Sequence, residues 1–377
     1  PQSADYPHLD PALIDQLPND LKIIRCGRVG LSKTWSRIFP GRTALPYGSL
    51  SGIDNEGFLR KAMIWIRLNL VIPDMRVFWL PSALKAASAE LLKNKYTALI
   101  TTGPPHSTHL AGLILKRPAK CKWITDFRDP WLDIHYLKLN PPSAISRAIH
   151  GYLERKVLAK ADENLIVSQY ISDHLPAGKK TVLYNGYDAM RFQDKSYQTA
   201  ERFRIKYIGQ VTEGQRLDVF IEVLRQLSPS NAVDLVFIGT KLDESIRQQL
   251  DEIKTVNLRV KEFLSHDEAL QEMVSAELLI LLINDYEGNQ GMLTTKLFEY
   301  LGSRSRILLL GNTLGEAAQL VHKYQSGACF EYKQTSEAAE FIESLYDKVA
   351  SGQTIRSTAD LSEIETSTQV QTLIGLV

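Results

Sequence analysis

One lysine and three backbone amides lie ahead of, or at the start of, a predicted helix in a pattern that suits an anion. Gly291, Met292 and Leu293 precede or enter the segment LTTKLFEYLG, whose apolar spacing predicts the helix. Amides ahead of a helix can cradle an anion, and Gly291 lets the chain approach a ligand closely. Lys296 lies in the first turn, where a cation opposes the helix dipole, and a bound diphosphate would remove that conflict. The alternative is a surface pair between Lys296 and Glu299.

Two glycines end predicted strands in the same half of the chain. Gly209 closes the segment FRIKYIG and Gly239 closes DLVFIG, so each makes a tight turn at a strand end. Arg216 follows Gly209 by seven residues. We interpret Arg216 as a ligand for phosphate, because phosphate charge needs positive side chains and free amides. The alternatives are a solvent-facing arginine at a helix start and a Gly239 that serves only the backbone.

A second group of charged residues follows the predicted strand KWITDF. Asp126, Arg128 and Asp129 cluster at its end. Arg128 can stabilise a phosphate or orient an acceptor, while one of the carboxylates holds a hydroxyl. An ion pair between Arg128 and either aspartate is the alternative.

Two histidines lie at a Gly-Pro-Pro loop that enters a helix. His106 directly precedes Ser107, which we expect to cap this helix, and His109 follows. A loop histidine that faces a cleft can orient a hydroxyl or share a proton. Either histidine could instead be a polar surface side chain.

Short apolar segments alternate with helical segments from Tyr96 onward, and two series can be distinguished. The first contains TALITTG, KWITDF, NLIVS and TVLYNG, with helices at about 107–115 and 143–160. The second contains FRIKYIG, DLVFIG, NLRVKEFL, ELLILLI, RILLLG and GACF, with a helix at about 217–227. Ser265 and Glu268 have the spacing of a capping box at another helix start. This alternation predicts parallel sheets of the Rossmann kind.

The chain length and the restart of the pattern predict two domains. At 377 residues the chain exceeds what one hydrophobic core usually serves. We expect α/β domains at residues 1–190 and 191–377, with parallel sheets that face an interdomain cleft where ligands bind. Residues 1–190 carry 25 Lys and Arg against 16 Asp and Glu, and the remainder carries 19 against 27. The basic half suits an anionic acceptor or a membrane surface, unless composition simply drifts between solvated faces.

The composition bears on the cellular location. Cys26, Cys121 and Cys329 are far apart, which fits a reducing compartment. The sequence has neither a run of about 18 apolar residues nor the pattern of a signal peptide, so we expect a cytoplasmic protein. The segment FLRKAMIWIRLNL mixes basic, aromatic and apolar residues. This mixture favours peripheral contact with the inner face of a membrane, although an ordinary packing helix is the alternative.

An ordered series of motifs resembles the bacterial retaining GT-B glycosyltransferases of the group 1, family 4-like kind, which build cell-surface polysaccharides. The motifs are ITTGPPHSTHLAGLILKR, WITDFRDPW, YLERKVLAKADENLIVS, YNGYD, YIGQVTEGQR and GMLTTKLFEYLGSRSRILL. Each motif is weak alone, and their order and spacing carry the resemblance from about Tyr6 to the C-terminus. It implies the GT-B fold, with two Rossmann-like domains.

The resemblance assigns roles in the second domain. Similar enzymes hold the diphosphate with two basic residues, of which the first position is Gln210 here and the second is Arg216. Similar enzymes also carry two glutamates separated by seven residues. The second is Glu299, which would bind the ribose hydroxyls, whereas the first position is Gly291. The departures at Gln210 and Gly291 keep an inactive relative among the alternatives.

Two further positions follow from the same resemblance. The stretch from Lys261 to Leu264 falls where similar enzymes cradle the nucleobase, and Phe263 is the candidate apolar contact, with a core role as the alternative. Related transferases often place a His–Asp pair against the donor sugar, and this chain has Arg128 and Asp129 at that position.

The implied reaction is sugar transfer with retention, from a UDP- or GDP-linked donor to a glycan or lipid-linked acceptor. No catalytic metal, further cofactor or nucleic-acid partner is expected, and the departing phosphate can itself accept the acceptor proton. The alternatives are a GT-B nucleotide-sugar 2-epimerase and a catalytically inactive binding protein. Relatives open with a strand and a glycine-rich loop, and Pro1–Cys26 resembles the segment after that unit. We therefore expect roughly 40 further residues upstream, enough for one βα unit.

Overall fold

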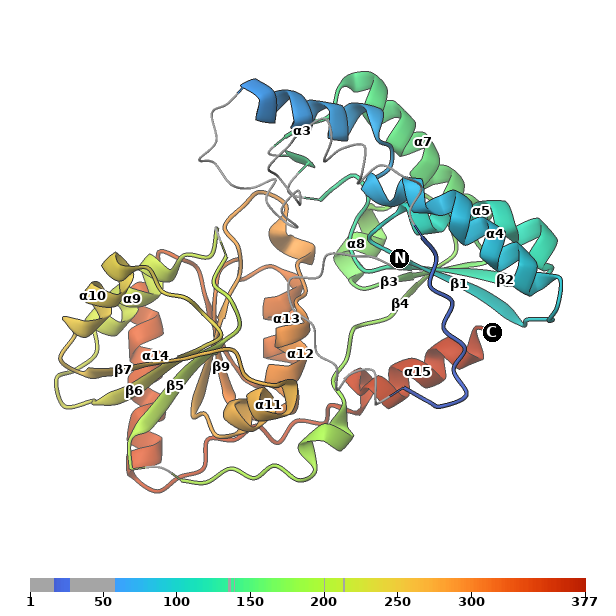
Figure 1. Ribbon diagram of the computed structural model, residues 1–377. Helices are drawn as coiled ribbons and strands as arrows, with labels where there is room; N and C mark the ends of the chain where they lie inside the picture. Colours follow the sequence, from blue (N-terminus) through green and yellow to red (C-terminus); the bar gives the residue numbers. More distant parts are fainter. Residues whose placement is uncertain (1–16, 28–57, 135–136, 139, 200, 213) are drawn as a thin grey trace. The chain divides into compact units, whose positions relative to one another are not determined.

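The computed structural model describes residues 17–27, 58–134, 137–138, 140–199, 201–212 and 214–377 (Figure 1). The chain divides into two compact units. The first unit comprises residues 1–167, 171–182 and 377, and the second comprises 168–170 and 183–376. The motif resemblance places Pro1–Cys26 after the first βα unit. Residues 1–16 of this segment lie outside the described residues. The assignment of residues 1–190 and 191–377 as the two domains stays a prediction.

The first unit contains a four-stranded sheet with the strand order β1-β2-β3-β4, and every pair is parallel. Its strands are β1 (Ala98–Gly103), β2 (Lys122–Phe127), β3 (Glu163–Ile166) and β4 (Lys180–Val182). The strands alternate with helices in the sequence, as the apolar pattern predicts. The carboxyl ends of β1 and β2 therefore lie next to each other, with Thr102 opposite Asp126 and Gly103 opposite Phe127.

The helices before β4 are α3 (Phe58–Leu70), the 3-10 helix η1 (Met75–Trp79), α4 (Leu80–Leu91), α5 (Ser107–Ala119), α7 (Ala144–Lys160) and α8 (Gln169–His174). Helices α5 and α7 lie at the positions predicted from the sequence, and α3 is the segment FLRKAMIWIRLNL, whereas the other helices before β4 were not predicted. The hydroxyl of Ser143 caps α7 by accepting from the Ser146 amide. The side chains of Phe58, Arg60 and Met63, which entered the membrane prediction, lie outside the described residues.

Helix α5 packs closely on the sheet through Gly112. A Cβ at this position would lie 2.1 Å from Nε1 of Trp123, so only glycine admits the helix at this distance. Trp123 is fully buried and its Nε1 donates to the hydroxyl of Thr101 at 3.0 Å. The core around it also contains Phe127, Trp131 and Ile166. This packing fixes the ends of β1 and β2, where the candidate residues lie.

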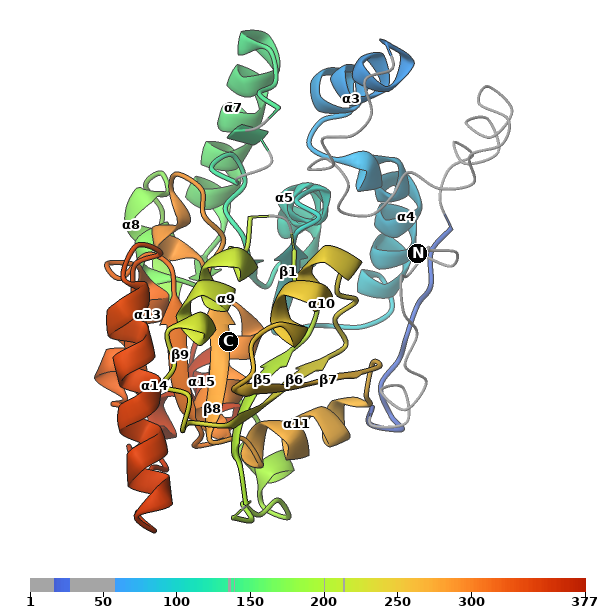
Figure 2. The same ribbon diagram turned by 90° about the vertical axis from the view of Figure 1, so that its left-hand side faces the viewer.

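The second unit contains a six-stranded parallel sheet with the strand order β10-β9-β8-β5-β6-β7. Its strands are β5 (Phe203–Ile208), β6 (Val233–Ile238), β7 (Val256–Lys261), β8 (Leu278–Leu282), β9 (Arg306–Leu310) and β10 (Gly327–Phe330). Figure 2 shows β5, β6 and β7 side by side. The chain runs outward from β5 to β7, returns to β8 beside β5, and runs outward again to β10. The two runs thus meet between β5 and β8.

Helices connect these strands and cover both faces of the sheet. They are η2 (Ala189–Phe192), α9 (Leu217–Arg225), α10 (Glu244–Asp251), α11 (His266–Val274), η3 (Asn289–Gly291), α12 (Thr295–Gly302), α13 (Glu316–Lys323), α14 (Thr335–Ala350), η4 (Ser362–Ile364) and α15 (Thr366–Gly375). The predicted capping box is present at α11, where Ser265 and Glu268 exchange hydrogen bonds. It fixes where α11 begins.

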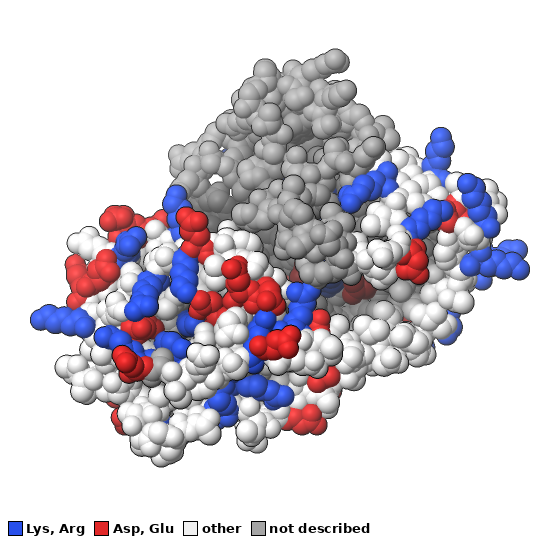
Figure 3. Space-filling view, turned by 60° about the horizontal axis from the view of Figure 1, so that its bottom comes forward, with Lys and Arg blue, Asp and Glu red and all other residues white. Residues whose placement is uncertain are grey.

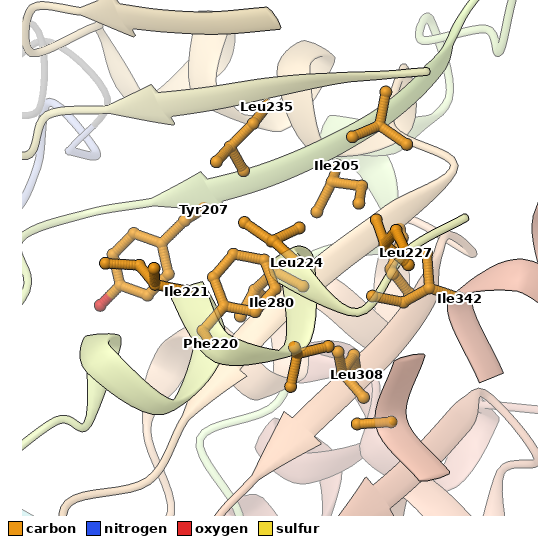
Figure 4. Packing of buried hydrophobic residues seen from close by; sticks show 14 of the residues in the cluster. Ile205, Tyr207, Phe220, Ile221, Leu224, Leu227, Leu235, Ile280, Leu308 and Ile342 are labelled. Atoms are coloured by element: carbon orange, nitrogen blue, oxygen red, sulfur yellow. The ribbon is translucent and has the colours of Figure 1, made fainter. Parts of the chain in front are cut away.

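Alternate residues of the central strands pack into two cores, one on each face. From β8, Leu278, Ile280 and Leu282 join the core that includes α9 and α14. Leu279 and Leu281 join the opposite core with α11, α12 and α13. Figure 4 shows part of the first core. Because both faces are covered, the strand is apolar throughout, as is usual for a parallel sheet.

Among the residues that the structure describes, no helix is both long enough and apolar enough to cross a membrane. Over the second unit, on the left in Figure 3, basic and acidic side chains are interspersed.

Candidate functional site

The carboxyl ends of β5 and β8 form a switch point in the second unit, because the strands on either side of it lead the chain in opposite directions. In open parallel sheets, ligands bind outside the strand ends at such a point. The loop after β5 and the loop after β8 are joined there. The amide of Asp285 donates to the carbonyl of Gly214 at 2.7 Å, and Nε2 of Gln215 donates to the carbonyl of Leu282 at 3.0 Å.

Lys296 lies at this switch point, and none of the described residues forms an ion pair with it. It is the second residue of α12, and its Nζ lies 4.0 Å from the centroid of the Tyr207 ring. A Cβ at Gly209 would lie 3.2 Å from this Nζ, so the lysine faces the end of β5. Within the described part of the chain, Nζ makes neither a hydrogen bond nor an ion pair. Burial lowers the pKa of Lys296 to about 8, although the negative charge of Glu299 opposes this shift.

The start of α12 offers further polar groups. Thr294 is the N-cap residue, yet its side chain accepts no capping bond. Its Oγ1 is buried and has no hydrogen-bond partner among the described residues. A helix start with free donors favours negative charge. Lys296 and this helix start therefore both favour an anion.

The predicted cradle of three amides is only partly present. Gly291 ends η3, and the amide of Met292 already donates to the carbonyl of Asn289 at 3.0 Å. The side chains of Met292 and Leu293 pack against the core of the second unit. The Met292 amide therefore already has an acceptor within a local turn. The apolar pattern of the sequence does not show this turn.

Glu299 lies on α12 almost one turn after Lys296. The predicted alternative, a surface pair between these two residues, is not formed among the described side chains. Oε1 of Glu299 instead lies 2.8 Å from Nε2 of His266, at the start of α11. The sequence analysis missed both His266 and Tyr207, because each contacts a residue from a distant segment of the chain.

Gly239 and Phe263 lie together at the ends of β6 and β7. Gly239 has a φ of +72°, a conformation that favours glycine, and its amide donates to the carbonyl of Lys261 at 3.1 Å. A Cβ at Gly239 would lie 3.7 Å from Cδ2 of Phe263. Phe263 is 70% exposed, so the alternative of a core role is wrong. An exposed aromatic ring beside a strand end offers a flat surface for stacking.

Arg216 is held by carboxylates of its own unit. It is the N-cap residue of α9, and its guanidinium donates three hydrogen bonds to Asp218, with a shortest distance of 2.8 Å. A further contact reaches Asp285 at 3.4 Å. The hydrogen bonds that Arg216 donates to Asp218 raise the pKa of Arg216 above its usual value. A phosphate ligand must therefore compete with Asp218 for this arginine.

In the first unit, the charged cluster at the end of β2 forms without the predicted ion pair. Nη2 of Arg128 donates to the carbonyl of Pro104 at 2.7 Å, and no described aspartate pairs with this arginine. Asp126 accepts from the hydroxyl of Thr102 at 2.6 Å. Burial raises the pKa of Asp126, and it raises the pKa of Asp129 to about 6. Both carboxyl groups thus accept a proton at a higher pH than an exposed aspartate does.

The two histidines lie inside the first unit, which contradicts the alternative of polar surface side chains. His106 is 5% exposed and stacks on Trp131 with ring centroids 4.9 Å apart. His109 is fully buried, stacks on Phe127 and shares a hydrogen bond with Thr101 at 3.0 Å. Burial lowers the pKa of His106 to about 3 and lowers the pKa of His109 as well. Both rings are therefore neutral near pH 7.

The predicted cap of α5 is also wrong. Ser107 is the first helical residue rather than the N-cap, and the N-cap residue His106 makes no capping bond. Asp74, which precedes η1, accepts from the amide of Ser107 at 2.8 Å and from its hydroxyl at 2.9 Å. A carboxylate 33 residues away thus supplies the acceptor that a local cap would have supplied.

Comparison with solved structures identifies the fold. HepE from Anabaena in complex with UDP matches with a TM-score of 0.59 and 15% identity, over 79% of this chain and 81% of HepE. A glycosyltransferase from Rickettsia africae matches with a TM-score of 0.53 and 12% identity, over 79% and 77%. The lipopolysaccharide outer core galactosyltransferase WaaB matches with a TM-score of 0.53 and 12% identity, over 80% of each chain.

The chain thus has the α/β architecture of GT-B glycosyltransferase structures, with parallel sheets of four and six strands. HepE has also been solved in complex with UDP-glucose, and that structure matches with a TM-score of 0.50. No protein-family model matches the sequence. A search among curated proteins likewise finds no match.

Proposed function

We propose that this chain is a glycosyltransferase that transfers a sugar from a nucleotide-diphosphate donor to an acceptor. The observation that carries the proposal is the partly buried Lys296, which lies at the switch point of the second unit's sheet and forms no ion pair with a described residue. A buried cation without an anionic partner is costly, and a bound diphosphate offsets that cost. Phosphate also suits the start of α12, where Thr294 lacks a capping bond.

The second unit would hold the donor, which is also the role proposed for residues 191–377. Lys296 and the helix start bind the diphosphate, Glu299 binds the ribose hydroxyls, and Phe263 contacts the base. Gly209 and Gly239 keep the strand ends free of side chains, while Gly291 and Leu293 contribute backbone groups beside the phosphate. Arg216 binds the diphosphate only after its hydrogen bonds to Asp218 are broken. Support comes from HepE, a protein of similar fold that was solved with UDP and with UDP-glucose.

The first unit would serve the acceptor, as proposed for residues 1–190. Asp129 combines partial burial with a pKa of about 6, which suits a group that holds or accepts a proton from a hydroxyl. Asp126 is oriented by Thr102, and Arg128 is exposed and pairs with no described carboxylate. His106 is a weaker candidate for proton transfer because its buried ring has a pKa of about 3.

The finer parts of the proposal come from the motif resemblance. They are retention of anomeric configuration, a UDP- or GDP-linked donor, and a glycan or lipid-linked acceptor in cell-surface polysaccharide synthesis. A nucleotide-sugar 2-epimerase and an inactive binding protein remain the competing functions. An epimerase would act without an acceptor, whereas an inactive protein would bind the nucleotide sugar without releasing the sugar.

A panel of UDP- and GDP-sugars tests the proposal on the full chain. Each sugar is supplied with and without a lipid-linked glycan acceptor, and nucleotide release, sugar products and binding heat are measured. Nucleotide release that requires the acceptor supports a transferase, and NMR of the product then reports the anomeric configuration. Epimer formed without acceptor indicates the epimerase, and binding without turnover indicates an inactive protein. If neither UDP nor GDP binds, the proposal is wrong.

We further propose that helices α3 and α7 contact an anionic membrane at the inner face. Three exposed apolar side chains of α7, Ile145, Ile149 and Tyr152, recur on one helix face. Helix α3 adds exposed Trp65 and Leu70. The two helices are joined by two hydrogen bonds, one of which runs from the Ser143 amide to Oδ1 of Asn69 at 2.7 Å.

Charge on these helices fits anionic lipid. The described side chains that are exposed on α3 and α7 include the basic residues Lys61, Arg147, Arg155 and Lys156. The acidic residue of α7, Glu154, is 5% exposed. Apolar side chains flanked by basic ones bind anionic bilayers through burial and electrostatic attraction together.

Vesicle co-sedimentation tests the membrane contact. We expect the protein to bind vesicles that contain phosphatidylglycerol and to remain free with phosphatidylcholine alone. The double variant Ile145→Glu, Ile149→Glu should lose this binding. Val370→Glu, at an exposed position of α15, is the matched control and should retain it. Equal binding of all three proteins would contradict this surface.

A further inference from the structure

His266 lies between the carboxylate proposed to bind ribose and an arginine of the segment that opens the second unit. Its Nε2 is 2.8 Å from Oε1 of Glu299, and its Nδ1 is 3.0 Å from Nη1 of Arg191. The motif resemblance assigned no role to His266 or to Arg191. Both contacts use ring nitrogens, so the ring can have only one arrangement of its protons that satisfies both.

The chemistry of the two partners determines that arrangement. Arginine can only donate, so Nδ1 of His266 must present its lone pair to Arg191. An ionised carboxylate can only accept, so the proton must lie on Nε2 and point to Glu299. The ring is therefore the neutral Nε2–H tautomer. An imidazolium would place a proton on Nδ1 against the guanidinium and would lose that contact.

Both ends of this chain of contacts are held in place. His266 is the first residue of α11, whose start is fixed by the capping box of Ser265 and Glu268. Arg191 lies on η2 and is itself 3.5 Å from Asp188, the N-cap residue of that short helix. A salt bridge of 2.7 Å between Lys195 and Asp267 also connects this segment to α11. The ring orientation is thus set by two elements and not by Glu299 alone.

The contact leaves one carboxylate oxygen of Glu299 available. His266 engages Oε1, and Oε2 has no hydrogen-bond partner among the described residues. The Glu299 side chain is 20% exposed, so without a fixed partner it could turn through several rotamers. A donor at Oε1 restricts that freedom before any ligand arrives, which is how hydrogen bonds behind a ligand-contacting group improve binding.

We propose that His266 is a positioning residue that orients Glu299 toward the ribose hydroxyls of a nucleotide, with Arg191 selecting the required tautomer. This inference rests on the proposed function, because it takes Glu299 as the ribose ligand. It adds a residue that acts through Glu299 without touching the nucleotide, and it links the ribose site to the segment 188–195.

Calorimetric titration with two ligands tests the inference. The ligands are whichever of UDP and GDP the wild type binds, and its 2′,3′-dideoxy counterpart. His266→Leu should weaken binding of the ordinary nucleotide about tenfold and change binding of the dideoxy nucleotide less than about twofold. His266→Gln should restore most of the loss, because its amide can donate to Glu299 and accept from Arg191 at once. Arg191→Met should weaken the ordinary nucleotide about threefold.

His322→Leu is the matched control, because His322 is exposed on α13 of the same unit, and it should leave both affinities unchanged. If His266→Leu weakens both nucleotides equally, or neither, the positioning role is wrong. If the wild type binds neither UDP nor GDP, the proposed function fails instead.

A ligand-free measurement separates the two failures further. Nitrogen-15 NMR of the histidine rings, assigned with His266→Gln, should show the neutral Nε2–H tautomer for His266 in the wild type. Arg191→Met should yield a tautomer mixture. An imidazolium or an Nδ1–H tautomer near neutral pH would overturn the inference whatever the nucleotide result.

Discussion

At the carboxyl end of β5, the second unit partly buries a cation, whereas at the carboxyl end of β2 the first unit partly buries two carboxyl groups. Lys296 has a pKa lowered to about 8, and Asp129 has a pKa raised to about 6. Burial is the first cause in both cases and disfavours the charged form. In neither case does a described side chain of opposite sign form an ion pair with the group.

The opposite signs indicate different chemistry at the two strand ends. An unpaired lysine is stabilised when a phosphate arrives, so the second unit is suited to hold an anion. An aspartate with a raised pKa is closer to accepting a proton at neutral pH, so the first unit is suited to a hydroxyl group. If this contrast is correct, a substitution in one unit should change binding and a substitution in the other should change turnover.

Lys296→Met should have the largest effect on this comparison. We expect nucleotide binding to weaken about 100-fold, because a charge-assisted contact to phosphate is lost. The free energy of unfolding at pH 7 should rise by about 2 kcal/mol in the absence of ligand, because burying the charge no longer costs anything. Titration calorimetry and urea unfolding measure the two quantities.

Lys323→Met is the control for this prediction. Lys323 is about half exposed, lies in the same unit and pairs with Glu363 at 2.5 Å, so its loss should alter neither quantity appreciably. Unchanged nucleotide affinity in Lys296→Met would contradict the assignment of the anion site.

Asp129→Asn should reduce turnover about 30-fold while nucleotide affinity changes less than about twofold. In the wild type, a pKa raised to about 6 means that the carboxylate is ionised above pH 6 and protonated below it. Activity should therefore fall as pH drops through 6, and the variant should lack this acid limb. Steady-state kinetics from pH 5 to 8 measure it, with Asp133→Asn, an exposed position, as the control. Loss of nucleotide binding in Asp129→Asn would break the contrast between the units.

Nucleotide affinity should fall about tenfold between pH 7 and pH 9, because Lys296 loses its proton as pH rises through about 8. Ligand-free stability has the opposite trend. The folded pKa is lower than the usual 10.5, so the unfolded chain binds more protons between pH 8 and 10.5 and the cost of burial is relieved over that window. Titrations at several pH values test this, and Lys296→Met should remove the slope. If nucleotide affinity still falls with pH in the variant, another titrating group causes the pH dependence.

Arg216→Met should have the smallest effect, about threefold on nucleotide affinity. The hydrogen bonds to Asp218 and the contact to Asp285 must be exchanged for the phosphate contact, so little is gained on binding. Asp218→Asn should improve affinity modestly because it releases the arginine. A loss in Arg216→Met as large as that in Lys296→Met would show that the arginine leaves its carboxylates fully in the complex.

Local sequence determined the elements and several of their ends. The alternation of apolar segments predicted the strands that carry the site, because side-chain periodicity follows directly from backbone geometry. Ser265 and Glu268 form the predicted capping box because its partners are only three residues apart. Gly209 and Gly239 have positive φ at the predicted strand ends. The position of Lys296 in the first turn of a helix could also be read from the sequence.

Only the tertiary structure decided how these side chains are paired and buried. His106 is buried against Trp131, Arg216 is held by Asp285 from another strand end, and the cap of Ser107 comes from Asp74. The Tyr207 ring under Lys296 and the contact of His266 with Glu299 likewise join segments far apart in the chain. Residue type and spacing fix local hydrogen bonds, whereas burial and pairing depend on which distant segments the packed sheet brings together.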